Sequence, residues 1–151
     1  MNITPVAHIE SGFKEKFGIP RQSGLVSDTV AYIVFEKEYK NPDYIKGIED
    51  YSHLWLIWNF SKSNPSSVKP LVTPPRLGGN VKKGVFATRS PFRPNGMGLS
   101  SVRLEQVIYD DKRGPVLVVS GADLLDGTPI YDIKPYLAYT DSHGDARCGF
   151  A

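Results

Sequence analysis

A chain of 151 residues, of which 40% are hydrophobic and 23% charged, has the composition of one soluble globular domain with a modest core, and its net charge of +2 selects no class of partner. The single Cys148 excludes an internal disulfide, and the three histidines are widely scattered. The first residues show no signal-peptide pattern, and the longest apolar run, residues 54–58, is too short to span a membrane. We therefore expect a cytoplasmic protein without a membrane segment or a structural metal.

Seven segments have the β-branched and aromatic composition of strands, and each is bounded by Gly, Pro, Asn or Asp. In chain order they are residues 4–10, 29–36, 52–60, 84–90, 98–110, 115–125 and 128–137. In the second of them Val30, Tyr32 and Val34 alternate as one buried face of a strand does. Helical periodicity is nearly absent, and the one predicted short helix spans residues 41–48, with Asn41 as its N-cap and Pro42 at its first position.

Many short strands with little helix predict an all-β, mainly antiparallel fold. A small closed or nearly closed β-barrel is preferred over a sandwich, because closure removes the unpaired edges of the sheet. No repeat or linker divides the chain, so residues 1–151 are expected to form a single domain. The long connection 61–84 carries Pro-Pro and Gly-Gly pairs, which favours an ordered binding loop.

The charged residues are strongly segregated along the chain. Residues 51–104 contain no Asp or Glu, and the sixteen acids divide into eight before this segment and eight after it. The same segment carries eight cations: Lys62, Lys69, Arg76, Lys82, Lys83, Arg89, Arg93 and Arg103. Unless folding mixes the segments and evens out the charge, such a block favours binding of phosphates or another anion.

No standard nucleotide-binding or covalent-catalysis signature is present, but four stretches combine turn residues with polar groups that suit a ligand. "FGIPRQSGL" offers Arg21 and Gln22 on a turn, and "PPRLGGN" offers Arg76 beside a Gly-Gly pair. Each is explained nearly as well by an ordinary surface turn. These two motifs therefore define no chemistry by themselves.

The other two stretches are more distinctive. In "ATRSPFRPNG", Arg89 closes a predicted strand, and Arg93 follows Phe92, an arrangement that could stack a base, although Phe92 could equally anchor the loop in the core. In "DLLDGTPIYDIKPYL", Asp126-Gly127 predicts a tight turn, where Asp126 could accept from a ribose hydroxyl or an adenine amine. A hairpin alone would need only the turn.

Taken together, the blocks "FGIPRQSGL", "SHLWLIWNF", "PPRLGGN", "GVFATRSPFRPNGMGLS" and "LLDGTPIYDIKPYL" resemble the TsaA-like (TrmO) family over roughly residues 3–142. The resemblance implies a β-barrel, usually homodimeric, that uses S-adenosylmethionine to methylate the exocyclic nitrogen of threonylcarbamoyladenosine next to the tRNA anticodon. It also implies a set of cofactor-binding residues, which comprises Pro20, Arg21, Gln22, Ser61, Lys62, Arg89, Leu99, Asp126, Gly127, Thr128 and Pro129.

Two departures from the family pattern bear on these expectations. Some relatives have His-Gln in place of Ser61-Lys62, so those side-chain contacts differ here. Several bacterial relatives continue into a small C-terminal domain, and this chain is expected to lack it, as a natural short form or as a shortened chain.

Methyl transfer from a sulfonium needs proximity and alignment more than covalent activation, together with an acceptor for the proton that the nitrogen loses. Asp126, Asp132 and Tyr136 are the candidates for that acceptor. The anticodon loop is single-stranded, and we expect the acid-free segment to contact it through Arg76, Lys82, Lys83 and Arg93. Two alternatives stay open: a β-barrel RNA-binding module without catalysis, and an enzyme that uses the same cofactor on a small molecule.

Overall fold

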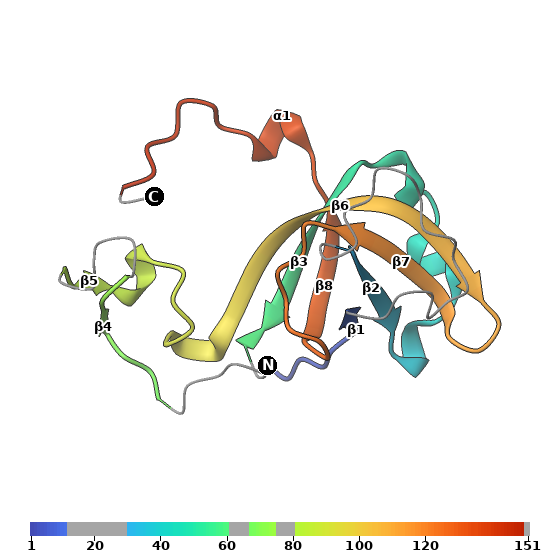
Figure 1. Cartoon of the computed structure of the whole chain (residues 1–151), viewed down its shortest axis with the longest axis horizontal. Coiled ribbons are helices and arrows are strands. Elements are labelled where there is room, and N and C mark those ends of the chain that lie inside the picture. Colours follow the sequence, from blue (N-terminus) through green and yellow to red (C-terminus); the bar gives the residue numbers. More distant parts are fainter. Residues whose placement is uncertain (12–29, 61–66, 75–80, 150–151) are drawn as a thin grey trace.

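Six antiparallel strands form a closed barrel in the computed structural model, which describes residues 1–11, 30–60, 67–74 and 81–149 (Figure 1). The order around the ring is β1 (Ala7–Ser11), β2 (Val30–Phe35), β7 (Gly114–Ser120), β6 (Met97–Asp110), β3 (His53–Asn59) and β8 (Pro129–Pro135). Pairing of Ala7 with Ile130 closes the ring. The predicted all-β class and the antiparallel barrel are therefore confirmed.

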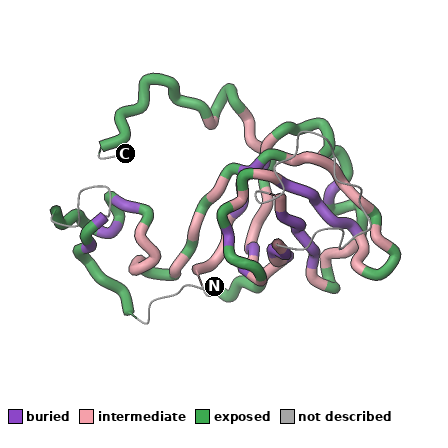
Figure 2. The backbone as a smooth tube through the Cα atoms, viewed as in Figure 1, coloured by how far each residue is buried: buried purple, intermediate pink, exposed green. Residues whose placement is uncertain are grey.

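The barrel interior is filled by the apolar side chains that alternate along the strands. Ile33 pairs with Leu117 between β2 and β7, Leu54 pairs with Val102 between β3 and β6, and all four side chains belong to the main core. On the opposite face of β2, the predicted alternation of Tyr32 and Val34 forms a second buried cluster. Burial of Tyr32 raises the pKa of its phenol. Figure 2 shows the buried residues concentrated in these strands.

The long strand β6 links the barrel to the rest of the molecule. Its first half pairs with β3 and its second half pairs with β7, and the register shifts by one residue between Leu104 and Gln106. A bulge of this kind bends a strand and increases its twist. The bend lets β6 pair with β3 along its first half and with β7 along its second half.

A small lobe stands beside the barrel at the start of β6, and we call residues 67–74 and 81–92 the β4–β5 lobe. Its sheet has only two short strands, β4 (Leu71–Val72) and β5 (Lys83–Gly84), followed by the 3-10 helix η7 (Val85–Ala87). Val85 and Val72 are buried in it. The predicted strand 84–90 is thus wrong, because the Thr88 hydroxyl and backbone N–H both bond to the Val85 carbonyl and wind this segment into a turn.

Two further predicted boundaries are corrected. The strand predicted for 115–125 ends at Ser120, because Gly121 takes a left-handed conformation with φ of 79°. The helix predicted for 41–48 forms two 3-10 helices, η3 (Pro42–Ile45) and η4 (Ile48–Asp50), separated at Gly47, whose φ is 88°. Asn41 caps the first of them through its bond from the Asp43 N–H, as predicted.

The remaining described helices are short. They are η2 (Lys37–Tyr39), η8 (Pro94–Gly96) and the single α-helical turn α1 (Ala138–Asp141). Asp141 anchors α1 by accepting from the Trp55 indole at 2.8 Å and from the Leu137 N–H at 2.9 Å. None of the helices that the structure describes is long and apolar enough to cross a membrane.

Candidate functional site

A cleft of about 970 Å³ lies where the ends of β3 and β6 meet the β4–β5 lobe and the loop after β7. Its described lining comprises Ile57, Trp58, Asn59, Phe60, Thr88, Arg89, Arg93, Met97, Gly98, Leu99, Ser100, Ser101, Gly121, Asp123, Leu124, Leu125 and Thr128. Its volume lies in the range of sites that bind small molecules and cofactors. The cleft brings together Arg89, Leu99 and Thr128, three residues expected to bind the cofactor, from three separate segments of the chain.

The indole of Trp58 forms one wall of the cleft and is held from two sides. Its N–H donates to the Ser100 hydroxyl at 2.9 Å, and its ring meets Phe60 edge-on at 4.5 Å between centroids. Trp58 lies opposite Gly98 across the β3–β6 ladder, where a Cβ would come within 2.5 Å of the indole. Gly98 is therefore required by the close approach of the ring. Beside it, Leu99 presents an apolar surface that is 45% exposed.

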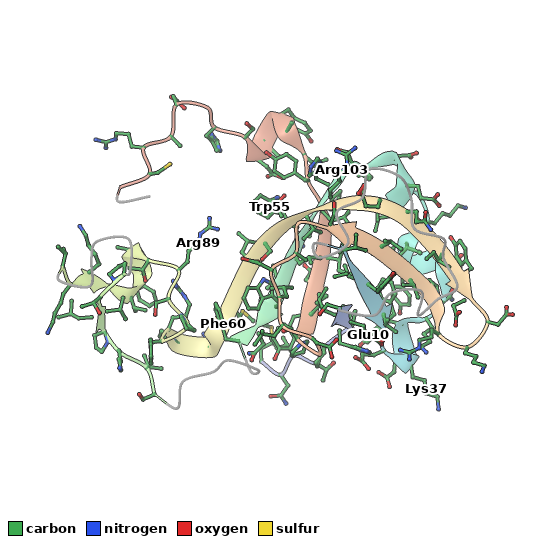
Figure 3. The ribbon with its side chains drawn as sticks, viewed as in Figure 1. Glu10, Lys37, Trp55, Phe60, Arg89 and Arg103 are labelled. Carbon is green, nitrogen blue, oxygen red and sulfur yellow. The ribbon has the colours of Figure 1, made fainter. Side chains whose placement is uncertain are left out.

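Arg89 is the more available of the two cations in the described lining of the cleft. Its side chain is exposed and has no hydrogen-bond or ion-pair partner among the described residues. Figure 3 shows it projecting from the β4–β5 lobe into the space beside β6. It lies in a loop rather than at the end of a strand as predicted. A guanidinium that no described residue engages, on the wall of a cleft, suits a carboxylate or a phosphate.

Arg93, by contrast, stabilises the conformation of its own loop. Its Nη1 donates to the carbonyls of Thr88 and Ser90 at 2.7 and 3.3 Å. The Arg93 guanidinium lies 6.0 Å from the Phe86 ring centroid, and the stacking of a base on Phe92 and Arg93 stays a prediction. The ring of Phe92 receives the ammonium of Lys69, at 4.3 Å.

The predicted tight turn at Asp126-Gly127 is present and is fastened to β1. The Thr128 N–H bonds to the Leu125 carbonyl, and Gly127 has φ of 83°, which defines a turn that needs glycine at its third position. Asp126 Oδ1 accepts from the Ser11 N–H at 2.9 Å. Asp126, Gly127 and Pro129 are not part of the described lining of the cleft, whereas Thr128 is.

The other candidates for the proton acceptor lie elsewhere. Asp132 pairs with Lys134 at 2.8 Å, a contact that raises the pKa of the lysine, and Tyr136 packs against Trp55 and His53. Neither Asp132 nor Tyr136 lines the cleft. The described lining instead includes one carboxylate that sequence reasoning missed, the exposed Asp123. Its only signal in the sequence is its place three residues before the Asp-Gly turn.

The remaining predicted site residues are located as follows. Lys82 and Lys83 are exposed at β5 on the β4–β5 lobe. Six residues lie outside the described part of the chain: Pro20, Arg21, Gln22, Ser61, Lys62 and Arg76. Within the described part, no group of three or more His, Cys, Asp or Glu side chains is arranged to hold a metal ion.

Comparison with known proteins gives relatives over nearly the whole chain. The tRNA (adenine(37)-N6)-methyltransferase of Escherichia coli K12 is 45% identical over 143 residues, which are 95% of this chain and 60% of that protein. The human protein of the same name is 44% identical over 140 residues, 91% of this chain and 30% of its own length. A Pseudomonas aeruginosa protein described as the putative S-adenosylmethionine-dependent methyltransferase RcsF is 45% identical over 150 residues, 99% of this chain and 60% of its own.

Solved structures agree with these relatives. A crystal structure of TrmO matches all of this chain and 64% of its own with a TM-score of 0.73 at 40% identity, and one of TrmO from Pseudomonas aeruginosa does so over 62% of its length with a TM-score of 0.71 at 39% identity. This chain thus spans about three fifths of the bacterial relatives' length. The model of the tRNA-methyltransferase O N-terminal domain matches residues 8–142. The chain therefore belongs to the tRNA-methyltransferase O N-terminal domain family.

Proposed function

We propose that this protein transfers a methyl group from S-adenosylmethionine to the exocyclic nitrogen of threonylcarbamoyladenosine, next to the anticodon of tRNA. The observation that carries the proposal is the convergence of Arg89, Leu99 and Thr128 on one cleft, in a chain of this family. The names of its relatives, tRNA (adenine(37)-N6)-methyltransferases, support the same reaction.

The residues of the cleft fit the cofactor by their chemistry. Arg89 offers a carboxylate a guanidinium that no described residue engages, and the exposed side chain of Leu99 offers an apolar contact for a ring or an alkyl chain. The Thr128 hydroxyl donates to the Leu125 carbonyl, which leaves its oxygen as an acceptor toward a ligand. The other expected contacts, Pro20, Arg21, Gln22, Ser61, Lys62, Asp126, Gly127 and Pro129, remain part of the proposal. S-adenosylmethionine, when bound, supplies an electrophilic methyl group on its sulfonium.

The chain's own task in the reaction is to align the nitrogen and to receive its proton. The nitrogen forms a bond to the methyl carbon, the electron pair of the broken carbon–sulfur bond stays on sulfur, and the N–H proton must leave. Asp123 is the one carboxylate among the described residues of the cleft lining, so we propose it as the acceptor in place of Asp126, Asp132 and Tyr136. Asp126 is less suited, because its Oδ1 holds the Ser11 N–H.

The RNA is proposed to approach from the β4–β5 lobe. Lys82 and Lys83 are exposed there, and Arg93 lines the neighbouring cleft, while Arg76 belongs to the same acid-free segment. Such a surface attracts the phosphates of a single strand. The proposal further includes a homodimer and a cytoplasmic location, as the resemblance to the family implies.

The decisive experiment incubates the full chain with labelled S-adenosylmethionine and threonylcarbamoylated tRNA, followed by nucleoside analysis. We expect label in the N6-methylated form of that nucleoside and none with tRNA that lacks the threonylcarbamoyl group. Asp123→Asn should lower the rate and Asp132→Asn should not. RNA binding without transfer would favour the non-catalytic RNA-binding module, and transfer to a small molecule but not to tRNA would favour the third hypothesis.

A further inference from the structure

A second cleft, of about 810 Å³, adjoins the first at Arg89, and its described lining belongs to the β4–β5 lobe. Its described lining comprises Lys69, Leu71, Val72, Thr73, Pro74, Lys82, Thr88, Arg89, Ser90, Pro91 and Phe92. Thr88 and Arg89 line both clefts, so they form the wall between the two. The two clefts are therefore neighbours that share Thr88 and Arg89 as lining residues.

The second cleft is strongly cationic. Lys69, Lys82 and Arg89 line it, and the described lining contains no carboxylate. Every one of these lining residues comes from the acid-free segment 51–104, so no acid next to them in sequence offsets their charge. Three cations around a concave surface focus a positive potential inside it. An anionic ligand is the chemistry that this charge selects.

The same cleft also carries an apolar wall. Leu71 is 57% exposed, and Val72, Pro74, Pro91 and Phe92 continue the apolar surface. The Lys69 N–H donates to the Phe92 carbonyl at 2.9 Å, and the Lys69 ammonium lies 4.3 Å from the Phe92 ring centroid. These two contacts hold one cation against the aromatic wall. A ligand that matches the cleft has a planar apolar part and an anionic part.

We propose that the second cleft is a nucleotide subsite for single-stranded RNA. It takes one unpaired nucleotide next to the methylated base, with the base against Leu71 and Pro91 and the phosphate beside Lys69 and Lys82. Arg89, on the shared wall, contacts the cofactor on one side and the RNA on the other. This inference rests on the proposed function and adds to it a place for the RNA strand and a reason for the position of Arg89.

The subsite is tested by the salt dependence of RNA binding. A fluorescent single-stranded oligoribonucleotide with the sequence of a tRNA anticodon loop is titrated with the full chain at several salt concentrations. Each phosphate contact contributes about −0.7 to the slope of log affinity against log salt for single strands. Lys69→Ala and Lys82→Ala should each make the slope shallower by about 0.7, whereas Lys69→Arg should restore it. Lys37→Ala, on the barrel far from the cleft (Figure 3), should leave the slope unchanged.

Two further variants separate the parts of the subsite. Leu71→Ser should weaken RNA binding at every salt concentration with an unchanged slope, because it removes apolar contact and no charge. Arg89→Ala should weaken the binding of both RNA and S-adenosylmethionine, whereas Lys69→Ala should leave cofactor affinity intact. Slopes for Lys69→Ala and Lys82→Ala equal to the native slope, or no binding of the oligoribonucleotide by the native chain, would overturn the inference.

The failure of this inference is distinct from failure of the proposed function. If the native chain methylates modified tRNA while both lysine variants keep the native slope, the RNA subsite lies elsewhere and only the inference is lost. If the slopes fall as expected but no methyl transfer occurs, the cleft binds RNA and the proposed reaction is wrong.

Discussion

The barrel and the β4–β5 lobe are held together by different forces. Most neighbouring strands of the barrel pair at five or more positions, although β1 and β8 pair at only two, and the barrel has a core in which Leu54, Ile33 and Leu117 are fully buried. The lobe has a ladder of two residue pairs, and of its described residues only Val72, Pro74, Val85 and Thr88 are buried. Hydrophobic burial therefore dominates the stability of the barrel and contributes far less to that of the lobe.

In the lobe, hydrogen bonds between side chains and the backbone provide stability that a larger apolar core would otherwise provide. The Thr88 hydroxyl bonds to the Val85 carbonyl, the Ser90 hydroxyl accepts from the Phe92 N–H, and Arg93 spans the same loop. Bonds of this kind shape a loop locally and require no partner strand. The candidate site lies at the junction of the two regions, so a rigid scaffold provides Trp58, Gly98 and Leu99, and a locally shaped loop provides Arg89.

The largest expected effect is on the free energy of unfolding, and it compares a substitution in the core of the barrel with one in the core of the lobe. Leu54→Ala removes a fully buried side chain from the barrel and should lower the free energy of unfolding by about 2–5 kcal/mol, measured by denaturant titration. Val72→Ala should change it much less, because the lobe can open without the barrel. Equal losses in the two variants would mean that lobe and barrel unfold as one unit.

The next largest effect is expected for the contact between Arg89 of the lobe and the cofactor. Arg89→Ala should weaken S-adenosylmethionine binding by about 1.5–3 kcal/mol, since a charge-assisted contact is lost. Calorimetry at several protein concentrations measures the affinity and reveals any dependence on dimerisation. Arg103→Ala is the matched control, because Arg103 pairs with Glu105 on β6 and does not line the cleft. An Arg89→Ala protein with native affinity would remove Arg89 from the site.

A third prediction concerns the barrel side of the cleft. Gly98→Ala places a methyl group within 2.5 Å of the Trp58 indole, so the ring must move. Overpacking of this kind costs about 1–3 kcal/mol of stability. Denaturant titration should show that loss, and adding Trp58→Leu to the same chain should recover part of it. No loss in the single variant would contradict the close packing of the two residues.

In the lobe, charge reversal at Lys82 and Lys83 should change the binding of RNA and not that of the cofactor. Lys82→Glu with Lys83→Glu should flatten the salt dependence of tRNA binding by roughly 1.4, from about 0.7 per lost phosphate contact, and leave cofactor affinity nearly intact. A barrel variant of equal charge, Lys37→Glu with Lys46→Glu, serves as the control. If both double variants flatten the slope equally, net charge rather than the lobe surface governs binding.

The smallest effect is confined to α1. The Leu137 N–H and then the Trp55 indole donate to Asp141 and hold the pKa of its carboxyl below the ordinary value of 3.8. A lowered pKa in the folded state stabilises the docking of α1 above pH 3.8, and this contribution disappears as pH falls through the lowered value. The NMR signal of the Trp55 indole N–H should shift below pH 3.8. Asp141→Ala should show the shifted signal already at neutral pH.

Much of the barrel could be predicted from local patterns. Three features depend only on residues a few positions apart: the apolar alternation in β2 and β7, the Asn41 cap and the Asp126-Gly127 turn. Such features can be predicted from the order of residues in the sequence. The segment 84–90 has the composition of a strand and was predicted as one wrongly. Composition does not reveal whether a partner strand is available. Here the Thr88 hydroxyl donates to the Val85 carbonyl and accepts from the Ser90 N–H, and these bonds hold the backbone in a turn.

The sequence by itself determined the β class of this protein, its acid-free segment and the set of cations from which a site can be built. Only the tertiary structure decided which of them meet. Arg89, Leu99, Asp123 and Thr128 line one cleft because a bulged β6 and the turn fastened to β1 bring their segments together. Arg93 donates to the backbone of its own loop, and Asp123 lines the cleft. Neither could be predicted, because the partners of a side chain depend on distances in space, which residue spacing along a chain does not encode.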